Sequence, residues 1–371
     1  MTANLLLPGD HAPWFQAPAL SGAPQYAFQT VAGRHVAMLF LGSARLEACA
    51  AALRLALERR RIFDDHKACF FGVTLDQDDA AQGRIAQSLP GIRFFLDYDR
   101  KVSAAYGALG GRGDGEGVEY RPHWLILDRA LRVVQRFPID QGGEALDLLE
   151  TLVSAPTEDE WAPVLLVPNV FEPELCRELI DLYESDGGAE SGFMRDVDGK
   201  TTLIVDAAHK QRRDCMIEDE ALRGRLVARM NRRLSPALDR AFRFEATRIE
   251  RYLVACYTAG AGHFRPHRDN TTKGTAHRQF AVTINLNAGD YDGGDLRFPE
   301  YGGRTYRAPT GGAVVFSCSL LHEATPVTRG KRYAFLPFLY DEDAARIREE
   351  NLPFLDPELT GYSASPASAE A

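Results

Sequence analysis

Residues 251–270 have the sequence RYLVACYTAGAGHFRPHRDN and open a region of short β-rich runs. Clusters of Gly, Asp and Asn, which favour turns, separate these runs. The runs that we expect to be strands are 251–257, 279–287, 295–298, 304–307, 313–317 and 331–340. Many short strands with frequent turns predict a β-sandwich or barrel in this half of the chain.

The same stretch contains an H-x-D pair, His267 and Asp269. On an extended segment, residues i and i+2 point to the same face, so an imidazole and a carboxylate lie side by side. His322 follows the apolar run 313–316, and a later strand can return it to the same edge. Two histidines and one carboxylate are a typical ligand set for non-haem Fe(II), with three positions left open. An H-x-D also occurs by chance, and the same ligand types bind zinc in hydrolases.

A charged residue, Arg332, lies ten residues after His322 in the apolar run 331–340. A buried guanidinium requires an anionic partner. The far carboxylate of 2-oxoglutarate is such a partner, and an arginine can bind it at two points. The structural alternative is an ion pair within the protein. Lys331 is expected to point to the opposite face of the strand.

Several ordered motifs resemble one enzyme family. The resemblance is to the prolyl 4-hydroxylase branch of the 2-oxoglutarate/Fe(II) oxygenases, especially the HIF-type enzymes and their bacterial relatives. It runs through RYLVACYTAGAGHFRPHRDN, INLNAGDYDGGDLRFPE and GGAVVFSCSLLHEATPVTRGKRYAFLPFLYDE, and upstream through VPNVFEPELCRELIDLYE. It implies a mainly β domain, a double-stranded β-helix (jelly roll) with flanking helices.

Site residues carry over by position. The resemblance implies that His267, Asp269 and His322 bind iron and that Arg332 binds the C5 carboxylate of 2-oxoglutarate. Tyr257 matches a tyrosine that lines the co-substrate pocket, although an ordinary core tyrosine is an equal alternative. Asn285 stands where HIF-type enzymes have a second tyrosine near the co-substrate.

The implied activity is that of a 2-oxoglutarate-dependent dioxygenase. It uses Fe(II), 2-oxoglutarate and O2, with ascorbate (vitamin C) as reductant, and hydroxylates a C–H bond of a protein or peptide, prolyl-hydroxylase type. Succinate and CO2 are the co-products. A non-catalytic, metal-binding interaction protein is an alternative that the same ligands allow.

The first 150 or so residues alternate strand and helix patterns, which indicates an α/β fold. The motifs GDHAPWFQAPALSG, GRHVAMLFLGSARLEAC and RPHWLILD resemble the peroxiredoxin (AhpC/TSA) branch of the thioredoxin fold. Cys49 occupies the place of that family's reactive cysteine and Arg121 that of its later arginine. A helix N-terminus and an arginine there would lower the thiol pKa. Thiol peroxidase activity through Cys49 is therefore a second hypothesis.

This half departs from the peroxiredoxin pattern in two places. Gly42 and Leu46 stand where the family has Pro and Thr (or Ser), and no resolving cysteine is evident. The missing hydroxyl would normally orient the thiolate. These departures favour a degenerate, non-catalytic partner domain with an inert cysteine.

The polar segment SAPTEDE (154–160) is expected to link two domains, 1–155 and 156–345, with 346–371 as an acidic, partly disordered tail. The net charge is −9 and falls mostly after residue 340, which argues against nucleic-acid binding. No run is long enough for a membrane span, and no secretory signal is present, so we expect a cytoplasmic protein with six reduced cysteines. The sequence does not indicate an oligomeric state.

Overall fold

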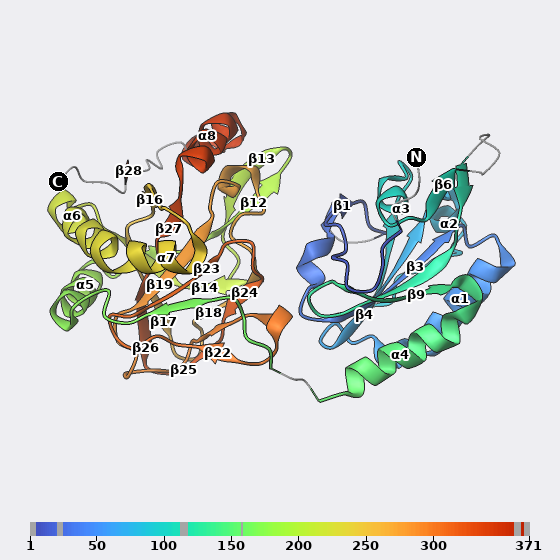
Figure 1. Cartoon of the computed structure of the whole chain (residues 1–371), viewed down its shortest axis with the longest axis horizontal. Helices are drawn as coiled ribbons and strands as arrows, with labels where there is room; N and C mark the ends of the chain where they lie inside the picture. Colours follow the sequence, from blue (N-terminus) through green and yellow to red (C-terminus); the bar gives the residue numbers. More distant parts are fainter. Residues whose placement is uncertain (1–4, 21–24, 112–117, 157–158, 360–364, 367–371) are drawn as a thin grey trace. The chain divides into compact units, whose positions relative to one another are not determined.

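The computed structural model describes residues 5–20, 25–111, 118–156, 159–359 and 365–366 (Figure 1). The chain forms two compact units, Met1–Asp159 with Pro299–Gly302 and Glu160–Phe298 with Gly303–Ala371. Among the described residues, no helix combines the length and the apolar character needed to cross a membrane.

The first unit alternates strands and helices in the expected order. Its strands are β1 (Gln16–Ala17), β2 (Tyr26–Ala27), β3 (His35–Gly42), β4 (Ala68–Thr74), β5 (Ile92–Leu96), β6 (Leu109–Gly111), β7 (Val118–Tyr120), β8 (His123–Leu127) and β9 (Val133–Pro138). Its helices are α1 (Glu47–Glu58), α2 (Gln77–Ala81), α3 (Lys101–Ala105) and α4 (Gly142–Ser154).

One five-stranded sheet, in the order β5-β4-β3-β8-β9, organises this unit. Strands β3, β4 and β5 are parallel, whereas β8 and β9 are antiparallel to their neighbours. The apolar sequences HVAMLFLG and ACFFGVT form β3 and β4, which are buried along almost their whole length. Helices α1 and α4 pack on one face of the sheet, where their apolar residues join its core.

The second unit is mostly sheet. Its strands are β10 (Leu165–Val167), β11 (Ala189–Glu190), β12 (Phe193–Val197), β13 (Lys200–Ile204), β14 (Lys210–Gln211), β15 (Arg213–Met216), β16 (Arg248–Glu250), β17 (Leu253–Thr258), β18 (His263–His267), β19 (Phe280–Asn285), β20 (Asp292–Gly293), β21 (Leu296–Arg297), β22 (Thr305–Tyr306), β23 (Ala313–Ser317), β24 (His322–Ala324), β25 (Val327–Arg329), β26 (Lys331–Phe335), β27 (Phe338–Tyr340) and β28 (Ser365–Pro366). Its helices are α5 (Pro173–Asp186), α6 (Glu220–Arg229), α7 (Ser235–Phe242) and α8 (Glu342–Asn351).

Two sheets of this unit face each other. The larger runs β11-β15-β17-β26-β19-β27-β16-β28, with β23 paired to β19 and β10 paired to β23, and the smaller runs β14-β18-β24-β21-β22. Leu253, Ala255 and Tyr257 alternate along β17 and meet Phe264 and Ala324 of the smaller sheet in one buried cluster. The site described below lies between these two sheets.

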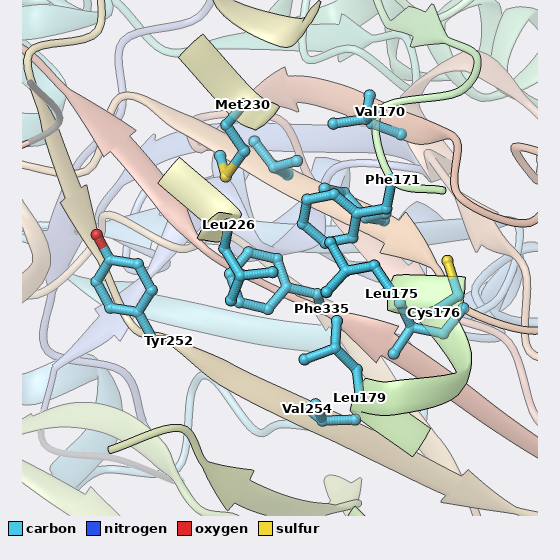
Figure 2. Close-up of a cluster of buried hydrophobic side chains, with 14 of the residues drawn as sticks. Val170, Phe171, Leu175, Cys176, Leu179, Leu226, Met230, Tyr252, Val254 and Phe335 are labelled. Carbon is cyan, nitrogen blue, oxygen red and sulfur yellow. The ribbon is translucent and has the colours of Figure 1, made fainter. Parts of the chain in front are cut away.

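Helices cover the other face of the larger sheet (Figure 2). The intervening residue Val254 of β17 and Phe335 of β26 point to that face, against Leu175 and Leu179 of α5 and Leu226 of α6. Strand β17 is therefore buried on both faces, which explains its unbroken apolar sequence.

Residues 220–242 form one continuous helical segment despite Pro236. A π-helical turn, Met230–Leu234, joins α6 to α7, and Pro236 lies in the first turn of α7, where a missing N–H is tolerated. Residues 346–359 were expected to belong to an acidic tail. In the structure, residues 346–351 form the second half of α8, and two short 3-10 turns follow. Residues 360–364 and 367–371, the part of the tail expected to be disordered, lie outside the described residues.

Candidate metal centre

Strands β18 and β24 bring two histidines together. His267 and His322 are direct cross-strand partners in this antiparallel pair, and their ring centroids are 4.3 Å apart. The register shifts by one residue between Phe264 and His267, so β18 contains a bulge in this segment, which includes Pro266. A bulge re-aims the side chains that follow it, and proline is tolerated there because it needs no ladder partner.

The third candidate ligand, Asp269, follows the end of β18 and is held by a hydrogen bond from its backbone N–H to the carbonyl of Cys318, 3.0 Å away. Its Oδ1 is 3.5 Å from Nε2 of His267, and its Oδ2 is 3.3 Å from Nε2 of His322. One ligand atom from each of the three residues lies within 4.8 Å of the others. The side chains retain 6–14% exposure, so the ligand atoms are not sealed in the core.

Backbone carbonyls fix the orientation of both imidazoles. Nδ1 of His267 lies 2.7 Å from the carbonyl oxygen of Arg265, and Nδ1 of His322 lies 3.0 Å from that of Leu320. A carbonyl only accepts, so each Nδ1 carries the proton and each Nε2 presents its lone pair to the site. This second interaction is what holds a metal-binding histidine in the correct tautomer.

The charge state of the site suits a divalent metal. Burial, aided by His322, lowers the pKa of His267 to about 4, so this ring is neutral at pH 7. Burial raises the pKa of Asp269, but the two imidazoles beside it outweigh that effect and hold it well below its usual range. Neutral imidazole nitrogen and an ionised carboxylate are the ligands that Fe(II) accepts in oxygenases, so the residues fit this metal.

Arg332 and Tyr257 lie next to each other on the face of the larger sheet that points between the two sheets. They are direct partners between β26 and β17, and the guanidinium carbon is 5.0 Å from the ring centroid. Arg332 is 2% exposed, and among the described residues its guanidinium forms neither a hydrogen bond nor an ion pair. An unpaired buried charge is costly, which indicates that a ligand completes this environment.

The neighbouring positions differ in role. Lys331 is exposed and pairs with Glu184 at 3.0 Å, so it does point away from Arg332, as strand alternation predicts. Asn285 is buried on β19, and its amide N–H donates to the carbonyl of Ala308 at 2.7 Å. Its Oδ1 is enclosed without a partner in the described structure. Asn285 thus holds the segment at Ala308 with one N–H of its amide, and its place in the co-substrate site stays a prediction.

A glycine makes room for the guanidinium. Gly294 has a φ of +66°, and a Cβ at this position would lie 2.8 Å from Cγ2 of Val327 and 3.1 Å from Cδ of Arg332. Both distances are tighter than a packed core tolerates. The side chain of Arg332 therefore keeps its path because residue 294 has no side chain.

Gly294→Ala is expected to destabilise the protein by about 1–3 kcal/mol, from backbone strain and the contact with Arg332. Gly260→Ala is the matched control, because Gly260 also has a positive φ, +82°, but nothing lies within 4 Å of its Cβ position. Urea unfolding gives the free energy of unfolding of the two ligand-free variants. Their difference separates backbone strain alone, in Gly260→Ala, from strain combined with the contact to Arg332, in Gly294→Ala. Equal losses in the two variants would show that position 294 does not shape the surroundings of Arg332.

Two kinds of neighbour were not predicted from the sequence. Phe264 stacks on His267 with ring centroids 3.4 Å apart, and Phe316 lies 4.6 Å from His322. Arg212, just before β15, donates from Nη1 to the hydroxyl of Tyr257 at 3.4 Å. Phe316 gave only an apolar strand signal, and Phe264 lay outside the expected strands. For Arg212, the available sequence signal was the alternation of the charged residues Lys210, Arg212 and Asp214.

The candidate thiol of the first unit is enclosed. Cys49 lies in the first turn of α1, but its side chain is 0% exposed in the core between helix and sheet. Burial, and then the nearby Asp79, raise the pKa of this thiol. No arginine contributes to lowering it. These surroundings are the opposite of those that activate a cysteine.

The other residues of the candidate thiol site have partners of their own. Arg121 is half-exposed and pairs with Glu119 at 3.1 Å. The ring of Tyr120 covers Gly42 so closely that a Cβ there would lie 2.6 Å from a ring carbon. The loop before α1 is tied instead to the buried carboxylate of Asp79, which accepts from the backbone N–H of Ala44 at 2.9 Å.

Two imidazoles and one carboxylate, with an unpaired buried arginine on the facing sheet, define a metal centre of the two-histidine, one-carboxylate type. Residues 252–340 match the family model of the 2OG-Fe(II) oxygenase superfamily. A PKHD-type hydroxylase of Stutzerimonas stutzeri is 30% identical over 160 residues, which cover 40% of this chain and 70% of that protein. The chain belongs to the 2OG-Fe(II) oxygenase superfamily, with PKHD-type hydroxylases among its relatives.

The match to other relatives is shorter. A PKHD-type hydroxylase of Synechococcus sp. (strain JA-2-3B'a(2-13)) is 36% identical over 92 residues. The match covers 23% of this chain and 41% of that relative, so the chain spans about two fifths of the relative's length. A Pseudomonas putida prolyl-4-hydroxylase structure is 19% identical, with a TM-score of 0.38, over 48% of this chain and 93% of that one. The structure of Mycobacterium tuberculosis AhpC is 22% identical, with a TM-score of 0.32, over 40% of this chain and 94% of that one.

Proposed function

We propose that this chain is a 2-oxoglutarate- and Fe(II)-dependent dioxygenase that hydroxylates a C–H bond of a protein or peptide, in the manner of a prolyl hydroxylase. The observation that carries the proposal is the convergence of His267, Asp269 and His322, with Arg332, a buried cation without a protein partner, on the strand face that points between the same two sheets. A zinc hydrolase has no need of such an arginine.

The residues divide the work between metal and co-substrate. His267, Asp269 and His322 would hold the metal and would leave ligand positions for 2-oxoglutarate and O2. Iron(II), when bound, supplies the redox chemistry that couples decarboxylation of 2-oxoglutarate to hydroxylation, giving succinate and CO2. Arg332 binds the far carboxylate and so fixes which end of the co-substrate reaches the metal.

The surrounding rings shield part of each imidazole from water. Phe264 and Phe316 pack against the two imidazoles. They also lower the local dielectric, which strengthens the attraction between Arg332 and a carboxylate. Ascorbate as external reductant and a protein or peptide as prime substrate complete the proposal.

The architecture is part of the same proposal. We take the two facing sheets of residues 156–345 as a double-stranded β-helix and residues 1–155 as a thioredoxin-like partner domain. The enclosed Cys49, with its raised pKa, speaks against the thiol peroxidase alternative.

The test is production of succinate from 2-oxoglutarate by the purified full chain. We expect turnover that requires added Fe(II), is stimulated by ascorbate and is unchanged in Cys49→Ser. Iron-independent turnover, or none at saturating Fe(II) and 2-oxoglutarate, would overturn the proposal.

A further inference from the structure

A row of three side chains crosses the larger sheet beside the metal centre. Strand β15 pairs with β17 through Arg213 and Cys256, so the residue before it, Arg212, lies beside Tyr257. Tyr257 in turn pairs with Arg332 of β26. The ring centroid of Tyr257 is 5.8 Å from the guanidinium carbon of Arg212 and 5.0 Å from that of Arg332. One buried phenol therefore lies between two guanidinium groups.

The guanidinium of Arg212 is fixed by its partners. Its Nε and Nη2 each donate to Asp214 at 2.6 Å, in a two-point ion pair. Nη2 also donates to Oγ of Ser191 at 3.1 Å, and that hydroxyl accepts from Lys210 at 2.6 Å. A two-point pair to a buried carboxylate sets both the position and the plane of the guanidinium.

The fourth N–H of Arg212, on Nη1, donates to the hydroxyl oxygen of Tyr257 at 3.4 Å. Since a guanidinium only donates, Tyr257 must be the acceptor in this contact. The phenol proton is then left to donate elsewhere, and within the described residues it has no other partner. Arg332, on the other side of the ring, lacks an anion. One carboxylate would satisfy both groups.

We infer that Arg212 is a positioning residue of the co-substrate site, which directs the hydroxyl of Tyr257 to donate to the carboxylate that Arg332 anchors. The inference rests on the proposed function and adds to it a residue that contacts neither metal nor co-substrate. Arg212 acts through Tyr257, whereas Asp214 and Ser191 hold Arg212 in place.

The test is calorimetric binding of 2-oxoglutarate to the full chain loaded with Mn(II), in the absence of turnover. Arg212→Lys keeps a cation beside Asp214 but lacks the branch that reaches Tyr257. We expect it to bind 2-oxoglutarate about tenfold more weakly, as expected for one lost hydrogen bond to a charged group. Tyr257→Phe should lose about as much, and the double variant should lose no more than Tyr257→Phe alone.

Arg223 provides a matched control. Its guanidinium carbon lies 5.4 Å from the ring of Tyr252, and its Nε donates to a backbone carbonyl, so it is a similar arginine–tyrosine contact away from the metal. Arg223→Lys should leave the affinity for 2-oxoglutarate unchanged.

Wild-type affinity for 2-oxoglutarate in Arg212→Lys would overturn the inference. So would a double variant whose loss of affinity equals the product of the two single-variant losses. If the Arg212 variant does not fold, wild-type affinity in Tyr257→Phe alone would also overturn it, because the phenol would then not bind the co-substrate. Absence of 2-oxoglutarate binding to the wild-type protein would instead refute the proposed function.

Discussion

Replacing His322 with alanine is expected to abolish succinate formation and to weaken Fe(II) binding by more than about a hundredfold. Loss of an outer hydrogen-bonding partner of a ligand already costs about 10–100-fold in metal affinity, and loss of a ligand costs more. The two remaining ligands, His267 and Asp269, cannot hold the ion on three sides. Equilibrium dialysis against Fe(II) under argon measures the affinity, and the succinate assay measures the activity.

His263→Ala is the control for this variant. His263 lies on β18 with His267, and its Nδ1 contacts the carbonyl oxygen of Ala261 at 2.7 Å, the same type of backbone contact that the two ligands make. It is not part of the metal cluster among the described residues. The control should retain metal and activity. Retention of both in His322→Ala would show that the three side chains do not act together.

Arg332→Met is expected to raise the dissociation constant for 2-oxoglutarate by about thirtyfold or more. Removing one partner of a buried, hydrogen-bonded charge pair costs about 2–5 kcal/mol of binding free energy. Metal affinity should not change, since Arg332 is not one of the three ligands. Binding of 2-oxoglutarate to the Mn(II) form measures the effect, and an unchanged affinity would place the far carboxylate elsewhere.

The same substitution separates ligand binding from stability. Arg332 has no ion-pair partner in the described structure, so Arg332→Met should not lower the free energy of unfolding of the ligand-free protein. Arg278 is the contrasting buried arginine, because it pairs with Glu250. Arg278→Met leaves that carboxylate short of its main partner and should cost about 3 kcal/mol. A comparable loss in Arg332→Met would mean that a protein group already neutralises it.

Much of the second unit could be predicted from the sequence because its strands are marked by apolar runs and turn residues. The runs 313–317 and 331–340 correspond to β23 and to β26 with β27. The strand pair that carries the two histidines was not among the predicted strands. Strands β18 and β24 are short and contain charged residues, so neither gives an apolar pattern.

The convergence of the ligands depended on pairing that no local pattern encodes. His267 and His322 meet because a one-residue bulge shifts the register of β18 against β24. The sequence spacing was compatible with this meeting but did not require it. Arg212 was missed for a related reason, since its place beside Tyr257 depends on the register between β15 and β17.

Polar strands were the main gap in the sequence-based description of the fold. Strands β12 and β13 form an exposed hairpin whose register joins Phe193 to Ile204, and few of its side chains are buried. Such strands are held by backbone pairing and lack the alternation of apolar and polar residues on which prediction depends. For Asn285, the substitution of the tyrosine of HIF-type enzymes was visible in the sequence, but its bond to Ala308 was not.

The central claim is that one metal ion and one molecule of 2-oxoglutarate share the site formed by His267, Asp269, His322 and Arg332. The most direct measurement is the visible absorption spectrum of the anaerobic protein as 2-oxoglutarate is added in the presence of Fe(II). We predict a charge-transfer band that saturates with 2-oxoglutarate in the wild-type protein, is absent in His322→Ala and needs far more 2-oxoglutarate in Arg332→Met. No band in the wild-type protein, or an equal band in His322→Ala, would contradict the claim.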